Sequence, residues 1–186
     1  MKEQIRRIVE LSASSVQTKM YGLPQFLADT DPAEVARRFA RADAGEFYGQ
    51  FNPQDVMLDS FWGDMELYGF RSLEKKQEGY SVHGRDHSPI PDWPEGMLVI
   101  GDCGGDPIML DPSEPGEILF AQHGMGVWEP LPIAADFEEL LNLSIAWLGM
   151  VDQRGENLLD DTDELEDESF ALFVQLARCL GIEQRY

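Results

Sequence analysis

A glycine-rich turn between two apolar runs constrains the fold of this chain most. Residues 97–100 and 108–110 are apolar and have strand length, and residues 101–107 between them hold three glycines and two aspartates. Glycine adopts backbone angles that other residues resist. Aspartate side chains hydrogen-bond local amides and hold turns. The pattern predicts a β-hairpin.

A third strand and then a helix follow this hairpin. Residues 118–120 form another short apolar run after a turn rich in proline and glycine. Asp136 is suited to the N-cap of a helix, with Glu139 at the third helical position. Apolar residues then recur at helical spacing as far as Leu148, before Gly149. The segment therefore predicts a meander that leads into a helix.

The glycine-rich turn lacks the features of a phosphate-binding loop. A P-loop needs a lysine and a serine or threonine after its glycines, whereas Asp106 and Pro107 follow here. Dinucleotide binding needs a helix at this point, and residues 108–110 have the pattern of a strand.

The order of these features resembles the SUKH superfamily of Smi/Knr-type proteins. The resemblance covers about a third of the chain, with a weaker continuation upstream at residues 67–74. Its motifs are residues 100–102 before the glycine pair, residues 105–108 leading to Leu110 and Asp111, residues 118–120 with His123 after them, Trp128, and residues 133–141.

The resemblance implies an α+β fold, a single mixed or antiparallel sheet of about five or six strands with helices packed on one face. We expect one domain over residues 1–186, with residues 1–45 as an N-terminal helical addition and residues 46–186 as the SUKH-like core. The length of 186 residues fits one domain.

The N-terminal part is predicted to be helical. Apolar residues recur at helical spacing from Ile5 to Met20, including Val16, which predicts one amphipathic helix. Asp31 followed by Pro32 predicts the start of a second helix that ends by Gly45. The aromatic-rich residues 46–69 fit helix and strand patterns in different parts. Most of their rings are expected in the core, with Trp62 and Tyr68 as candidates for an exposed partner surface.

Charge is distributed unevenly. The net charge is −21, yet residues 1–41 hold seven Lys or Arg against five Asp or Glu. The rest of the chain is therefore strongly acidic, which disfavours nucleic acid and anionic membranes and accelerates encounter with basic proteins. No apolar run approaches the roughly 18 residues of a membrane span, and the N-terminus lacks a signal peptide's apolar segment. We expect a cytoplasmic protein.

No catalytic centre and no cofactor are predicted. Cys103 and Cys179 are expected to be reduced thiols, and a triple of Cys103, His123 and Asp136 would arise by chance in so acidic a chain. His83 and His87 with an acid between them leave a metal-dependent hydrolase as a minor alternative. Residues 160–168 hold seven acids but lack the central glycine of an EF-hand, and they predict the acidic start of a last helix over residues 170–180.

The favoured function is that of a non-catalytic immunity protein, because many bacterial members of the family look like immunity proteins. The expected partner is a cognate protein toxin, possibly a basic nuclease-type domain, whose active surface this chain would occlude. A regulatory scaffold for a cellular client is the alternative. The partner-binding candidates are Trp62, Asp64, Glu66, Asp102, Asp106, Asp111, Glu117 and Asp161.

Overall fold

The computed structural model describes residues 1–60, 63–124 and 127–154. Its main element is a six-stranded antiparallel sheet in which neighbours in the sequence are neighbours in the sheet, in the order β3-β4-β5-β6-β7-β8. The strands are β3 (Val56–Ser60), β4 (Gly63–Leu67), β5 (Leu98–Cys103), β6 (Asp106–Leu110), β7 (Ile118–Phe120) and β8 (Leu131–Ala134). The predicted α+β class is confirmed, and the sheet is antiparallel throughout.

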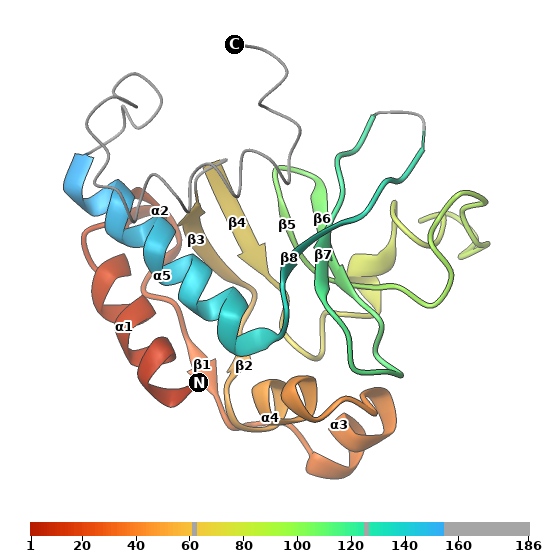
Figure 1. Ribbon diagram of the computed structural model, residues 1–186, viewed down its shortest axis with the longest axis horizontal. Coiled ribbons are helices and arrows are strands. Elements are labelled where there is room, and N and C mark those ends of the chain that lie inside the picture. Colours follow the sequence, from red (N-terminus) through yellow and green to blue (C-terminus); the bar gives the residue numbers. More distant parts are fainter. Residues whose placement is uncertain (61–62, 125–126, 155–186) are drawn as a thin grey trace.

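The helices lie around this sheet, and the longest of them crosses one of its faces (Figure 1). They are α1 (Lys2–Ser12), α2 (Val16–Tyr21), α3 (Pro32–Arg38), α4 (Ala42–Gln50) and α5 (Phe137–Arg154), with a short 3-10 helix η1 (Lys75–Gln77). A second, two-stranded sheet pairs β1 (Phe26–Leu27) with β2 (Asn52–Pro53). In Figure 1, α5 crosses in front of β3 and β4, α1 lies beside α5, and α3 and α4 lie below the sheet.

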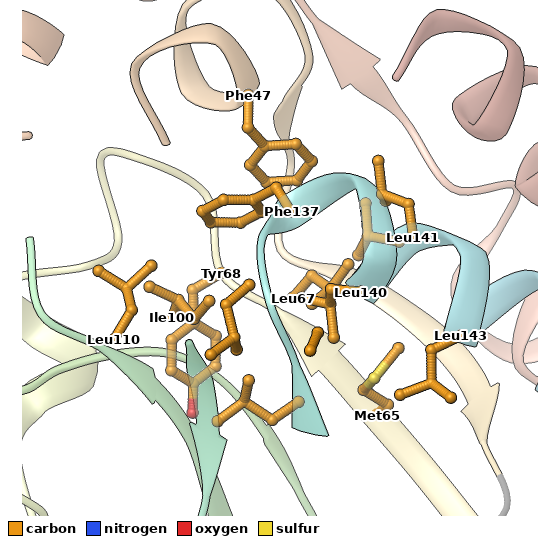
Figure 2. Packing of buried hydrophobic residues seen from close by; sticks show 14 of the residues in the cluster. Phe47, Met65, Leu67, Tyr68, Ile100, Leu110, Phe137, Leu140, Leu141 and Leu143 are labelled. Carbon is orange, nitrogen blue, oxygen red and sulfur yellow. The ribbon is translucent and has the colours of Figure 1, made fainter. Parts of the chain in front are cut away.

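The core lies between α5 and the sheet. Met65 and Leu67 of β4 face Leu140 and Leu143 of α5, and all four side chains are buried (Figure 2). Ile8 of α1 belongs to the same buried cluster. Fully burying such a side chain contributes about 1.5–3 kcal/mol, so this interface is a substantial source of stability.

The predicted hairpin is confirmed as β5 and β6, but its turn is shorter than the predicted residues 101–107, because residues 101–103 belong to β5 and residues 106–107 to β6. Gly104 and Gly105 form its turn with φ angles of 61° and 96°, a region that favours glycine. Gly101 lies inside β5 and allows the backbones of β4 and β5 to approach closely. A Cβ atom at this position would lie 2.5 Å from the backbone oxygen of Glu66 on β4. Strand β5 bulges between Val99 and Gly101.

Three of the predicted helix boundaries are wrong. The helix predicted from Ile5 to Met20 is divided, because the Ser15 side chain accepts the Thr18 amide and caps α2 separately. The second helix ends at Arg38 because Phe39 adopts extended angles and stacks on Tyr48, so Gly45 lies inside α4. Helix α5 continues past Gly149 to Arg154.

The predicted caps at Asp31 and Asp136 are confirmed. Asp31 accepts the Ala33 amide at 2.8 Å, and Asp136 accepts the Glu139 amide at 2.9 Å. The predicted last helix, with Cys179, lies outside the described residues. No helix among those described is both long and apolar enough to cross a membrane.

Candidate protein-binding surface

Four carboxylates form a row on the sheet face that points away from α5. Asp59 of β3 lies opposite Asp64 of β4, and Glu66 of β4 lies opposite Asp102 of β5. Strand side chains alternate between faces, and the neighbours of these residues, such as Leu58, are buried on the α5 side. Like charges directly opposite each other destabilise a sheet unless something compensates them. We call these four residues the acidic row.

The inner half of the acidic row is compensated within the chain. Lys76 Nζ lies 2.7 and 2.6 Å from the two carboxylate oxygens of Glu66 and 4.6 Å from the centre of the Tyr68 ring. Asp102 accepts the Tyr68 hydroxyl and, at 3.0 Å, the Gly105 amide. Glu66 and Asp102 therefore help to fix η1 and the hairpin turn to the sheet.

Tyr68 is part of this network and not of an exposed surface. The prediction that it would be an exposed contact is wrong, because its side chain is buried. Burial, followed by the hydrogen bond to Asp102, raises the pKa of the Tyr68 hydroxyl well above its usual value. The hydroxyl is therefore a permanent donor to that carboxylate.

The outer half of the acidic row lacks such compensation. Asp59 Oδ2 is buried and has no hydrogen-bond partner among the described residues. Asp64 is exposed and accepts a hydrogen bond from the side-chain Nε2 of Gln17 in α2. Neither carboxylate forms a salt bridge with a Lys, Arg or His in the described part of the chain. A buried acceptor without a donor is costly, so the negative charge here is poorly compensated, and the exposed Asp64 is the carboxylate that a cationic group from outside can reach.

Helix α2, which contacts Asp64 through Gln17, buries a polar side chain and exposes apolar ones. Gln17 is buried, with 5% of its surface exposed, whereas Met20 and Tyr21 are 66% and 59% exposed. Val16 and Leu23 are also exposed, at 39% and 51%. We call Val16, Met20, Tyr21 and Leu23 the α2 ridge. Exposed apolar side chains gathered in this way are typical of protein contact surfaces.

The sequence pattern does not predict the α2 ridge, because Val16 and Met20 have the spacing of one continuous amphipathic helix with Ile5 and Ile8. The run of serine and alanine from Ser12 to Ser15 was the available signal. Such residues favour caps over helix interiors, and the break they cause rotates the second helix relative to the first.

Three of the predicted site residues come together, since Asp64, Glu66 and Asp102 belong to the acidic row. Trp62 and Asp161 lie outside the described residues. Their proposed contacts with a partner stay predictions.

The other three predicted site residues lie apart from the acidic row. Asp106 ends the hairpin turn, where it accepts the His123 amide at 2.7 Å. Asp111 accepts the hydroxyl and, at 2.8 Å, the amide of Ser113, and these bonds lower its pKa. Glu117 is exposed in the loop before β7. Turn chemistry accounts for Asp106 and Asp111.

An aromatic cluster holds the long loop of residues 79–96 against the hairpin. The rings of Trp93 and Trp128 meet edge to face with centres 5.2 Å apart, and Tyr80 lies within 6.3 Å of both. Tyr80 also donates to the Gly105 carbonyl at 3.2 Å, and burial raises its pKa to about 12. This loop contains His83 and His87, which are both exposed.

The residues considered for catalysis have separate structural partners. Cys103 is buried beside Ser60, and burial raises the pKa of its thiol to about 12, so it stays protonated. His123 contacts Asp106, and Asp136 caps α5. No group of three or more His, Cys, Asp or Glu side chains among the described residues is placed to hold a metal ion.

The fold is thus an α+β meander with an acidic sheet face and an exposed apolar ridge. A sequence model of the SMI1 / KNR4 family (SUKH-1) matches residues 37–143, more than half of the chain. The chain therefore belongs to the SMI1 / KNR4 family, whose proteins generally bind partner proteins. No curated protein and no solved structure matches the chain.

Proposed function

We propose that this chain is a cytoplasmic, non-catalytic immunity protein that neutralises a cognate protein toxin by occluding the toxin's active surface. The proposal treats residues 1–186 as one domain with N-terminal helices added to the family core. The observation that carries it is the α2 ridge lying directly beside the uncompensated carboxylates Asp59 and Asp64.

Each half of this surface has its own role in binding. The α2 ridge supplies apolar area that a partner can bury, with Met20 and Tyr21 as the anchoring side chains. Asp59 and Asp64 attract a basic partner and can receive an arginine or lysine from it. A toxin that cleaves nucleic acid needs a basic groove for phosphates, and an acidic inhibitor that occupies this groove blocks its substrate.

A capture experiment tests the proposal. The tagged chain is incubated with extract of its own cells and with the product of any large gene adjacent to its own, at low and at elevated salt. We expect one basic protein at a one-to-one ratio, with weaker capture at elevated salt. Capture of several ordinary cellular proteins and no toxin would favour the scaffold instead.

Matched variants locate the surface. Asp59→Asn with Asp64→Asn removes two charges from the acidic row, and Glu95→Gln with Glu114→Gln removes two from exposed loops. Met20→Ser with Tyr21→Ser removes the two most exposed side chains of the α2 ridge, and Leu131→Ser removes an apolar side chain that is 40% exposed on β8. The first variant of each pair should lose the partner and the second should keep it. Equal losses within a pair would contradict this placement.

A further inference from the structure

An open hollow of about 460 Å³ lies at the C-terminal end of α3, and three arginines line it. They are Arg37 and Arg38 of α3 and Arg71, which follows β4, with Phe70, Glu34 and Glu74 completing the lining. Its volume is in the range of small-molecule sites. None of these residues belongs to the acidic row or to the α2 ridge.

Two of these arginines, Arg38 and Arg71, form no salt bridge with the described residues, which is unexpected in this chain. Acids outnumber Lys and Arg by 35 to 14, so a carboxylate is available to most basic residues. Arg41 makes two bonds of 2.8 Å to Asp43, and Lys76 contacts both oxygens of Glu66. Arg6 pairs with two glutamates.

The three arginines of the hollow differ from these. Arg37 lies 3.8 Å from Glu34, and Arg71 reaches only the Asp29 carbonyl, at 3.4 Å. Arg38 is half-buried and forms no hydrogen bond or salt bridge with another described residue. Most of the guanidinium donors at this hollow are therefore free for a ligand. Planar forks of donors match the oxygens of a phosphate group.

We propose that this hollow binds a phosphate group through Arg37, Arg38 and Arg71. Phe70, which is half-buried in the lining, offers an aromatic surface to an organic part of the ligand. Glu34 and Glu74 limit the excess of positive charge, so binding depends on the geometry of the arginine forks and not on net charge alone.

Titration of the full chain with inorganic phosphate, followed by backbone amide NMR, tests the proposal. Chloride at matched ionic strength is the salt control. We expect saturable shifts of one site, centred on residues 34–38 and 70–74, that chloride does not produce. Shifts spread over the whole surface, or equal shifts with chloride, would overturn the proposal.

Variants distinguish the site from general charge effects. Arg38→Gln and Arg71→Gln should each weaken phosphate binding about tenfold, because each removes charge-assisted hydrogen bonds. Arg85→Gln removes the same charge from the exposed loop of residues 79–96 and should change nothing. Equal weakening by Arg85→Gln would overturn the proposal.

Phenyl phosphate identifies the source of the phosphate group. Tighter binding than inorganic phosphate, lost in Phe70→Leu, would support a small organic phosphomonoester. Equal binding would support inorganic phosphate as the ligand. Failure of all these titrations would leave capture of the toxin unaffected, so the two proposals fail separately.

Discussion

The carboxamide of Gln77 takes the place of a strand beside Val99. Its Nε2 donates to the Val99 carbonyl at 2.9 Å, and its Oε1 accepts the Val99 amide at 3.0 Å. Strand β4 has ended at Leu67, so these backbone groups of β5 would otherwise lack a partner in the sheet. A third bond, to the Leu73 carbonyl at 2.8 Å, fixes η1 to the same point.

Replacing Gln77 by leucine should destabilise the protein. The change leaves a buried amide and a buried carbonyl of Val99 unpaired, at a cost of about 3 kcal/mol. Urea unfolding measures the loss, with Gln50→Leu at the exposed end of α4 as the control. A Gln77→Leu protein as stable as the control would show that the carboxamide does not complete the sheet.

Gly101→Ala should also be destabilising, by about 2 kcal/mol, because its Cβ atom would lie 2.5 Å from the backbone oxygen of Glu66. Gly45→Ala is the matched control. Gly45 lies inside α4 with nothing within 4 Å of a Cβ atom, so alanine should stabilise it by about 0.5–1 kcal/mol. In thermal or urea unfolding, the midpoint should fall for Gly101→Ala and rise for Gly45→Ala. Similar shifts for both would refute the close approach of β4 and β5.

The Arg41–Asp43 pair predicts a defined dependence of stability on pH. Burial raises the Asp43 pKa, but the hydrogen bonds and charge of Arg41 outweigh it, and the pKa is lower in the folded state. Its stabilisation is therefore complete above the ordinary aspartate pKa of about 3.9 and is lost as pH falls through the folded-state value.

Asp43→Asn should cost about 3 kcal/mol at neutral pH, because Arg41 is 2% exposed and would keep a buried charge without its partner. The difference in unfolding free energy between wild type and Asp43→Asn should shrink below about pH 4. A difference in unfolding free energy that stays constant from pH 7 to pH 3 would mean that the ionised Asp43 carboxylate does not stabilise the folded protein through Arg41.

Cys103 should resist alkylation in the folded protein. Its side chain is 6% exposed and its thiol pKa is raised to about 12, so little reactive thiolate is present at pH 8. Peptide-resolved mass spectrometry after iodoacetamide treatment should find Cys103 modified only when denaturant is added. Rapid modification of the native chain would place Cys103 on the surface.

Local signals in the sequence were sufficient for the hairpin and for the start of α5. The Gly104–Gly105 turn and the Asp136 cap depend on residues close in sequence, so their patterns specify them directly. The family resemblance predicts a mixed or antiparallel sheet of about five or six strands. The antiparallel register of that sheet then places Glu66 opposite Asp102.

Contacts between distant segments could not be predicted. Val16 and Met20 have the spacing of a buried stripe, and only the separate capping of α2 by Ser15 turns them outward. The bonds of Gln77 to Val99 depend on where β4 leaves the sheet. The hollow joins Arg38 to Arg71 across more than thirty residues, a distance at which a single sequence carries no pairing signal.

The association rate between this chain and its captured partner, measured by stopped-flow fluorescence at several salt concentrations, tests the central claim most directly. We expect the association rate of the wild-type chain to fall at least tenfold from low to high salt. At low salt, Asp59→Asn with Asp64→Asn should lower the rate similarly, whereas Glu95→Gln with Glu114→Gln should not. A rate that is independent of salt and equal in both variants would contradict binding through the acidic row.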